Sequence, residues 1–304
     1  MFKVAILGTE NLHALWFAEE ILSGAAETVE LLGIYGPEEQ ANLAILKLAE
    51  EAGVSVENAA SCDAFVGRVD MVLITARHGD LHHTYAMPYL EAGIPCWIDK
   101  PFTVRRDLAQ ELIEAARAHG TYLCGGSILA RDHGAAHLRS AITADPSPIG
   151  TVLGGSVGAP IKWMEEFGGF YFYSQHLIGM MMSIFGKKVE RVRAKRVGES
   201  VEAIFYYDNF FVMGTYYSTS FRYTATVWGT EMSMTCQSSP DDVRALQHDE
   251  LLAVERMLLS GGPDCTVEEL VLPYSILSAL DASIRDGEVK AVRDFSLFAD
   301  GRLL

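Results

Sequence analysis

The sequence predicts an α/β protein with two domains: a parallel sheet with flanking helices at residues 1–124, and an α+β domain with an open, mostly antiparallel sheet at residues 125–304. In the first segment, apolar strand-like runs alternate with helical stretches, as expected when helices join parallel strands. In the second segment, strand-like runs follow one another with only turn residues between them. The glycines of Gly125-Gly126-Ser127 mark the expected boundary.

In the first domain, strands are expected at residues 4–7, 29–35, 71–75, 94–98 and 121–124, and helices at residues 12–22, 40–52, 81–92 and 107–119. Gly93 and Gly120 stop the last two helices, since glycine readily adopts the left-handed backbone found at helix C-termini. A sheet with this order of elements is of the Rossmann type and binds ligands at the carboxyl ends of its strands.

In the second domain, an antiparallel meander is expected, with strands at residues 201–207, 210–218, 223–228 and 232–237. Helices expected at residues 170–185, 241–259 and 266–285 would cover one face of this sheet. The second strand is apolar on both sides, with Phe211, Met213 and Tyr217 on one side and Phe210, Val212 and Tyr216 on the other. This pattern predicts a homo-oligomer formed through the uncovered face; the alternative is a monomer with exposed aromatic residues.

Composition limits the classes of partner. The 304 residues carry a net charge of −16, and no Lys/Arg cluster follows the pattern of a phosphate-binding stripe. Nucleic acid and anionic membranes are therefore poor partners, and long-range attraction favours neutral or cationic small molecules. No apolar run is long enough for a signal peptide or a membrane span. The five scattered cysteines suit reduced thiols, so a cytoplasmic protein is expected.

The first candidate for chemistry is Lys100. The tripeptide Asp99-Lys100-Pro101 closes the strand at residues 94–98. A lysine at the carboxyl end of a strand in an open α/β sheet points into the crevice where such sheets bind ligands. Pro101 also biases Lys100 toward an extended backbone. The alternative is a solvated lysine in an ordinary turn.

Four segments, in this order, resemble the Gfo/Idh/MocA family of NAD(P)-dependent oxidoreductases. They are Val4-Ala5-Ile6-Leu7-Gly8, residues 70–75 through His82, Leu90-Glu91-Ala92-Gly93 into Asp99-Lys100-Pro101, and Gly168-Gly169 ahead of His176. The resemblance covers nearly the whole chain. It implies hydride transfer between NAD(P) and a sugar, a cyclitol or a related small hydroxy or keto compound.

The resemblance also implies catalytic residues. Lys100 would lie beside the nicotinamide and the substrate hydroxyl, and His176 would be the acid/base. The family usually has an aspartate four residues before this histidine and another acidic residue three residues after it, but this chain has Phe172 and Gly179. Tyr173 shares a helix face with His176 and is the candidate replacement. The alternatives are a core histidine and a core aromatic residue.

The resemblance implies a cofactor site at Gly8, Thr9, Glu10, Asn11, Gly36, Thr75, Ala76, Arg77, His82, Asp99 and Lys100. Only the first glycine of the family's G-x-G-x-x-G loop is present. Glu10 would place a carboxylate where pyrophosphate approaches, unless its side chain turns away. No Arg or Lys follows the second strand before Lys47, so NAD is favoured over NADP.

Lys162 and Trp163 are further candidates for substrate contact; the alternative is an exposed loop pair. The pairs His78/His82 and His133/His137 have zinc-like spacing but no evident third ligand, so no metal is expected. The leading hypothesis is an oxidoreductase. A ligand-sensing or scaffold protein that lost hydride transfer is the alternative, and a redox-neutral enzyme with tightly held NAD is a third possibility.

Overall fold

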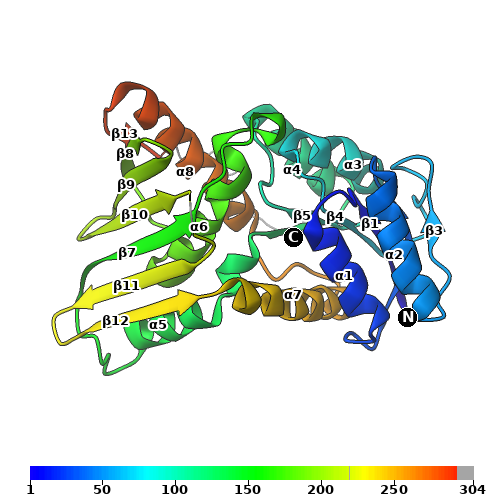
Figure 1. Ribbon diagram of the computed structural model, residues 1–304, viewed down its shortest axis with the longest axis horizontal. Helices are drawn as coiled ribbons and strands as arrows, with labels where there is room; N and C mark the ends of the chain where they lie inside the picture. Colours follow the sequence, from blue (N-terminus) through cyan, green and yellow to red (C-terminus); the bar gives the residue numbers. More distant parts are fainter. Residues whose placement is uncertain (219, 293–304) are drawn as a thin grey trace.

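The computed structural model describes residues 1–218 and 220–292 of the chain. It contains two sheets, one built from the N-terminal part of the sequence and one from the C-terminal part (Figure 1). The first sheet is parallel and the second is mixed but mostly antiparallel. The fold class predicted from the sequence is therefore confirmed.

The first sheet has the strand order β3-β2-β1-β4-β5-β6. Because the order reverses between β1 and β4, the carboxyl ends of these two strands form the crevice where Rossmann-type sheets bind ligands. β1 and β4 are fully buried over residues 4–7 and 71–74, which explains their continuous apolar sequences. The strands are β1 (Phe2–Leu7), β2 (Val29–Tyr35), β3 (Glu57–Asn58), β4 (Met71–Ile74), β5 (Cys96–Asp99) and β6 (Leu123–Gly126).

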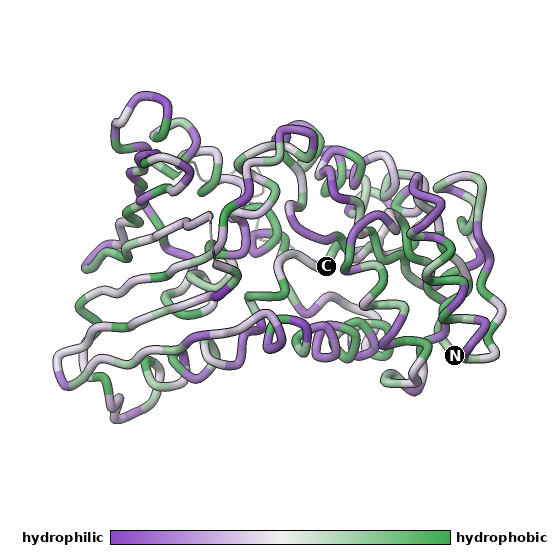
Figure 2. Tube along the Cα trace, viewed as in Figure 1, coloured by the Kyte–Doolittle hydropathy of each residue, from purple (hydrophilic) through white to green (hydrophobic). Residues whose placement is uncertain are grey.

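Helices cover both faces of this sheet. One apolar cluster joins the sheet to α3 (Gly79–Glu91) and α4 (Arg106–Ala118), and another joins it to α1 (Leu12–Leu22) and α2 (Glu39–Glu51). The second cluster also includes residues of α7 (Pro240–Ser260), which lies against α1 although it comes late in the sequence (Figure 1). In Figure 2, α7 alternates hydrophilic and hydrophobic turns, as expected of a helix with one buried side.

The second sheet has the strand order β12-β11-β7-β10-β9-β8-β13. The expected meander is wrong at one point: β7 lies between β10 and β11, parallel to β10 and antiparallel to β11. The two hairpins β9–β10 and β11–β12 match the expected pairing. The strands are β7 (Val152–Pro160), β8 (Arg191–Val197), β9 (Ser200–Tyr206), β10 (Phe211–Tyr217), β11 (Tyr223–Gly229), β12 (Ser233–Ser238) and β13 (Lys290–Ala291).

Helices lie on one face of this sheet, as expected. α6 contacts β7 and β10, α8 contacts β8, and α5 contacts β12. Val212 and Tyr216 of β10 are buried on this face, whereas Phe211 and Met213 on the opposite face are exposed. The remaining helical elements are η1 (Ile128–Arg131), α5 (His133–Thr143), η2 (Glu165–Phe167), α6 (Phe170–Phe185) and α8 (Val267–Asp286).

The division of the chain after residue 124 stays a prediction. Residues 124 and 125 both lie in β6, the last strand of the first sheet, and Ser127 caps η1 directly afterwards. All five cysteines are free thiols. Among the described residues, none of the helices has both the length and the apolar character that a membrane crossing requires.

Candidate active site

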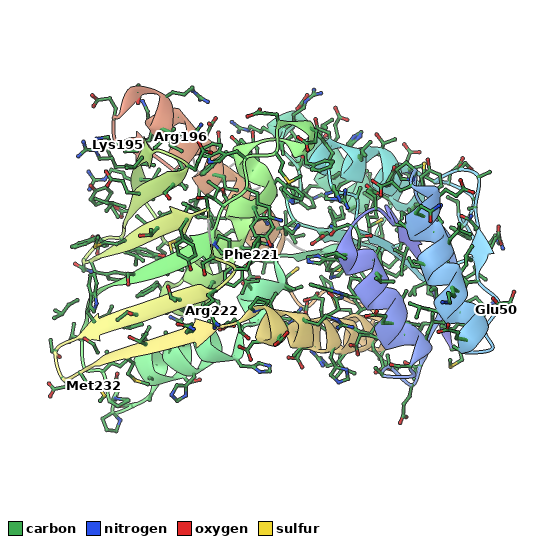
Figure 3. The ribbon with its side chains drawn as sticks, viewed as in Figure 1. Glu50, Lys195, Arg196, Phe221, Arg222 and Met232 are labelled. Atoms are coloured by element: carbon green, nitrogen blue, oxygen red, sulfur yellow. The ribbon has the colours of Figure 1, made fainter. Side chains whose placement is uncertain are left out.

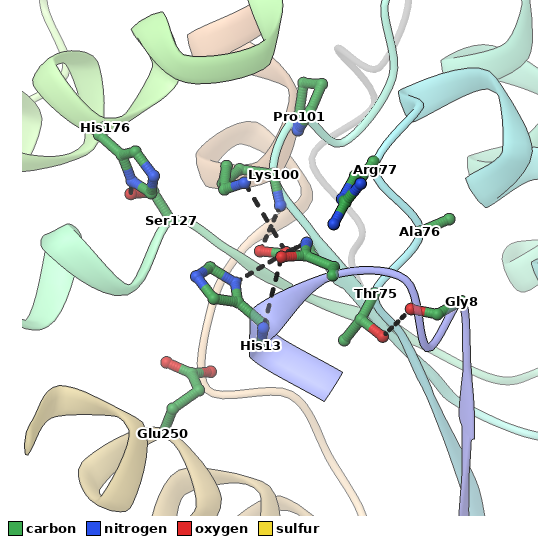
Figure 4. A network of polar contacts seen from close by, with 12 residues as sticks. Gly8, His13, Thr75, Ala76, Arg77, Lys100, Pro101, Ser127, His176 and Glu250 are labelled. Atoms are coloured by element: carbon green, nitrogen blue, oxygen red, sulfur yellow. Dashed lines mark hydrogen bonds and ion pairs between the residues drawn. The ribbon is translucent and has the colours of Figure 1, made fainter. Parts of the chain in front are cut away.

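Asp99, the last residue of β5, organises the crevice through hydrogen bonds (Figure 4). Its Oδ2 atom accepts a bond from Asn11 Nδ2 at 2.9 Å and lies 2.8 Å from His13 Nδ1. Its Oδ1 atom accepts the backbone N–H of Lys100 at 2.7 Å. Burial alone would raise the pKa of Asp99, but His13, Lys100 and these bonds outweigh it and hold the pKa well below its usual range. Asp99 is therefore a buried carboxylate.

Lys100 follows Asp99 and is only 3% exposed. Its Nζ atom lies 3.9 Å from Asp99 Oδ2 and 4.9 Å from the centre of the Phe172 ring. Its ion pair with Asp99 is longer than a hydrogen bond, and within residues 1–218 and 220–292 no other oxygen accepts from this ammonium group, although burying a weakly paired cation is costly. Burial lowers the pKa of Lys100, and Lys162 and Arg77 act in the same direction, while Asp99 opposes them.

His176, in α6, lies near Lys100 (Figure 4). Its Nδ1 atom lies 2.8 Å from Ser127 Oγ, and its ring makes edge contacts with Tyr173 at 5.0 Å and Tyr223 at 5.9 Å between centroids. Burial lowers the pKa of His176 well below its usual value, and nearby Lys100 and His13 lower it further. The imidazole is therefore neutral at neutral pH.

The two departures from the usual family pattern have local structural consequences. Phe172 presents its ring to the Lys100 ammonium group. Gly179 leaves room for Ser127, because a Cβ atom at position 179 would lie only 3.1 Å from Ser127 Cβ and 3.3 Å from Ser127 Oγ. The Ser127 hydroxyl group thus contacts His176, and α6 lacks the two acidic residues that the family usually has at positions 172 and 179.

The turn after β1 brings two strand ends together. Gly8 has φ = +94°, and a Cβ atom there would lie 2.3 Å from the backbone nitrogen of Ala76, so only glycine fits. Thr75 Oγ1 donates to the Gly8 carbonyl at 2.9 Å. The N-terminus of α1, capped by Asn11, opens directly after this turn, which is the place where a Rossmann fold receives a pyrophosphate.

Thr9 and Gly36 lie against each other at the ends of β1 and β2. A Cβ atom on Gly36 would lie 1.9 Å from Thr9 Oγ1. The Thr9 hydroxyl donates to Asn42 Oδ1, and Asn42 Nδ2 donates to the Gly36 carbonyl at 3.0 Å. This hydrogen-bond network fixes the strand end where the ribose of a dinucleotide would bind.

The side chain of Glu10 is turned into the protein and is 7% exposed as a residue. Its Oε1 atom accepts the backbone N–H of Arg77 at 3.1 Å, and its Oε2 atom is buried without a hydrogen-bond partner. Burial raises the pKa of Glu10, and bonds to backbone amides only partly offset this. The Arg77 guanidinium lies 3.6 Å from Glu38 and 5.4 Å from the centre of the Phe167 ring. Because the Glu10 carboxylate is directed toward the Arg77 backbone, the loop can accommodate a dinucleotide.

Other predicted site residues lie further from this centre. His82 is fully buried, with Nε2 2.8 Å from the Ala76 carbonyl and Nδ1 2.9 Å from the Pro101 carbonyl, so it braces two loops. Burial lowers its pKa. Trp163 donates to the Glu199 carbonyl at 2.9 Å. In the described ranges, no group of three or more His, Cys, Asp or Glu residues could hold a metal ion.

The sequence analysis missed His13 and Ser127. His13 contacts Asp99 across 86 positions of the sequence, and Ser127 contacts His176 across 49. Neither residue belongs to the segments that carry the family resemblance. The only local signal was the position of His13 in the first turn of the helix that follows the nucleotide loop.

The strand order, the glycine turn and the capped helix together define a Rossmann-type domain. Residues 2–126 match the model of the Gfo/Idh/MocA family, described as an oxidoreductase family with an NAD-binding Rossmann fold. Residues 2–126 are therefore an NAD-binding Rossmann domain of the Gfo/Idh/MocA oxidoreductase type. The recognition, the enzyme class and the NAD cofactor expected from the sequence are confirmed at this level.

Solved structures share the fold over almost the whole chain. A probable dehydrogenase from Thermotoga maritima is 15% identical, with a TM-score of 0.81 over 95% of this chain and 98% of its own. A myo-inositol 2-dehydrogenase from Lactobacillus plantarum is 14% identical, with a TM-score of 0.82 over 96% and 99%. A scyllo-inositol dehydrogenase from Lactobacillus casei, solved with NAD(H) and scyllo-inositol, is 15% identical, with a TM-score of 0.80 over 96% and 99%. No curated protein sequence is significantly similar to this chain.

Proposed function

We propose that this protein interconverts a secondary alcohol and a ketone in a cyclitol, a sugar or a related small hydroxy compound, with NAD as the hydride carrier. The observation that carries the proposal is the ammonium group of Lys100, which is buried between Asp99 and Phe172 without a hydrogen-bond acceptor among the described residues. A substrate hydroxyl or carbonyl oxygen would supply that acceptor. The inositol dehydrogenases with the same fold motivate the choice of substrate class.

Each residue has a distinct role in the proposed reaction. Lys100 holds the reacting oxygen and stabilises negative charge that develops on it. His176 removes the hydroxyl proton through Nε2, which requires the tautomer in which Nδ1–H donates to Ser127 Oγ. Tyr173, whose ring contacts His176, borders the same space. A bound NAD would supply the acceptor for the hydride that leaves the carbinol carbon.

The cofactor would be held at the carboxyl edge of the first sheet. The backbone at the N-terminus of α1 and the glycine turn would receive the pyrophosphate. Asp99 and His82 would act indirectly, because their polar atoms bond protein groups that shape the crevice. The proposed cofactor-site residues are Gly8, Thr9, Glu10, Asn11, Gly36, Thr75, Ala76, Arg77, His82, Asp99 and Lys100.

The test is NADH formation measured at 340 nm with inositols and common aldoses, in the intact protein and in two variants. Lys100→Met and His176→Ala are expected to lower kcat at least about a hundredfold, since each removes one transition-state interaction. Lys47→Met, at an exposed residue of α2, is the matched control and is expected to retain full turnover. Full turnover by both active-site variants would exclude the proposed roles.

A ligand-sensing protein is the second candidate, and the buried Glu10 carboxylate in the nucleotide loop is the observation that favours it. A carboxylate at this position repels pyrophosphate unless it is protonated or turned away. Calorimetry separates the two candidates. Binding of NAD without turnover on the whole substrate panel would support the sensor, whereas turnover with any member supports the enzyme.

We further propose that the protein associates with a second copy through the outer face of the second sheet. Phe211 and Met213 are 42% and 46% exposed on adjacent outward positions of β10. Their cross-strand neighbours on β9, Tyr206 and Ile204, extend the apolar surface. An open sheet with one apolar face left uncovered by helices is a common site of protein association.

A further inference from the structure

Lys162 lies directly after β7 and Ile161, next to the proposed catalytic residues. Its Nζ atom is 5.3 Å from the centre of the Tyr173 ring and 4.8 Å from the centre of the Phe221 ring. Phe221 is exposed and lies near the middle of the molecule, between its two halves (Figure 3). The ammonium group thus lies over two aromatic rings, and one of them, Tyr173, also contacts His176.

No carboxylate neutralises Lys162. Across the described part of the chain, it forms no ion pair, and its N–H groups donate to no oxygen. Aromatic faces attract a cation but accept no conventional hydrogen bonds from its N–H groups. Because Lys162 is exposed, water hydrates these groups, and an anionic group that entered the crevice could take the place of that water.

Lys100 and Lys162 act on the same space. They contact consecutive residues of α6, since Lys100 faces the Phe172 ring and Lys162 faces the Tyr173 ring. Burial lowers the pKa of Lys100, and the charge of Lys162 lowers it further, so the two cations interact electrostatically. Asp99, the carboxylate that pairs with Lys100, is already bonded to Asn11, His13 and the Lys100 backbone. A protein of net charge −16 thus has a locally positive crevice.

We infer that the substrate of the proposed dehydrogenase is an acid: its reacting hydroxyl group faces Lys100 and His176, and its carboxylate pairs with Lys162. This inference rests on the proposed function and narrows its substrate class to a hydroxy acid, such as a sugar acid. The carboxylate would replace the charge that Phe172 and Gly179 remove relative to the usual family pattern. The cofactor phosphates are not the expected partner of Lys162. Lys162 follows β7 of the second sheet, whereas Arg77 contacts the nucleotide loop of the first.

The test compares matched pairs that differ only in an acid group: glucose with glucuronate, galactose with galacturonate, and glycerol with glycerate. Calorimetry at low salt, with NADH-saturated protein, measures binding without requiring turnover. We expect at least one acid to bind about tenfold more tightly than its neutral partner, and the difference to shrink as salt is added. The inference is overturned if no acid binds more tightly than its partner.

Two variants locate the effect. Lys162→Met is expected to abolish the preference for the acid and leave affinity for the neutral partner unchanged. Lys195→Met, at an exposed residue of β8, is the control and is expected to retain the preference (Figure 3). A preference that survives Lys162→Met would contradict the inference. Preferential binding of an acid without NADH formation would instead contradict the proposed function alone, and turnover of neutral polyols together with no preference for any acid would contradict the inference alone.

Discussion

At the scale of single residues, the contact between Ser127 and His176 shows how the site works without the usual carboxylates. The hydroxyl group lies 2.8 Å from His176 Nδ1, and it accepts the backbone N–H of Leu129 at 3.3 Å, which fixes its position. A neutral partner orients the imidazole but stabilises its protonated form less than a carboxylate would. The protonated form of His176 is therefore weakly stabilised and releases its proton readily.

Ser127→Ala is predicted to lower kcat about tenfold, the effect of losing one orienting hydrogen bond of about 1.4 kcal/mol. Because Ser127 supports the protonated ring, its removal should also move the acidic limb of the pH–rate profile to lower pH. Steady-state kinetics across pH 5–9 measure both effects. Ser183→Ala, in the helix α6 that carries His176, is the control. A variant with a lower melting temperature but an unchanged profile would show that Ser127 has only a structural role.

Glu10→Gln is predicted to tighten NAD binding several-fold at pH 8, because it removes a negative charge worth about 1 kcal/mol beside the pyrophosphate site. Burial raises the pKa of Glu10 above its ordinary 4.5. In the unmodified protein, NAD affinity should therefore increase as the pH falls through this raised pKa and the carboxylate becomes neutral. Calorimetric titrations with NAD at several pH values should show this dependence vanish in Glu10→Gln. Glu38→Gln serves as the control, and equal pH dependence in Glu10→Gln would disprove the assignment.

The residues predicted from the sequence were those in continuous motifs. Lys100 and His176 lie near each other, as expected from a strand end and a glycine pair (Figure 4). The partners that tune them were not predictable, because Asn11 and Ser127 reach Asp99 and His176 across 88 and 49 positions. Local pattern contains no information about such long-range pairs, which depend on how strands and helices distant in the sequence pack together.

At the scale of elements, α7 ties the two halves of the protein together through one buried carboxylate. Glu250 accepts the indole N–H of Trp97, in β5, at 2.7 Å, and it pairs with Arg131 Nε, in η1, at 2.6 Å. Burial would lower the pKa of Arg131, but Glu250 and Asp264 outweigh it and raise the pKa. Glu250 thus fixes the strand that carries Asp99 relative to the start of the second domain.

Glu250→Gln is predicted to reduce the free energy of unfolding by about 3 kcal/mol, because it leaves a half-buried arginine without one of its charge partners. Asp249→Asn is the control on the adjacent position of the same helix. Its pair with His133 is exposed, so its loss should cost less than about 1 kcal/mol. Urea denaturation followed by circular dichroism measures both values. Equal effects of the two substitutions would mean that burial does not strengthen the Glu250 contacts.

The strand β7 was missed because its sequence does not alternate. Gly154, Gly155 and Gly158 lower the strand propensity of this segment. Their reason is tertiary: a Cβ atom on Gly155 would lie 2.3 Å from Phe185 Cζ, so glycine lets α6 pack closely on the sheet. The hairpins on either side of β7 were predictable, since their turns and alternation are local.

At the scale of the whole molecule, the two sheets use their faces differently. Helices cover both faces of the first sheet, but only one face of the second (Figure 1). The outer face of the second sheet is charged at β8, where Arg191, Arg193 and Lys195 are exposed, and apolar at β10. A second copy of the chain is the partner that would cover the apolar part while leaving the charged edge in water.

Met213→Glu and Phe211→Glu are each predicted to convert the associated protein into single chains, because a charge at the centre of an apolar interface must lose its hydration without a partner. Neither change should disturb the fold, since both side chains point away from the helices. Size-exclusion chromatography with light scattering at several concentrations measures the outcome, and Leu43→Glu, at an exposed position of α2, is the control. An unmodified protein that elutes as a single chain at every concentration, or variants that remain associated, would contradict an interface at this face and leave its aromatic residues as surface decoration of a monomer.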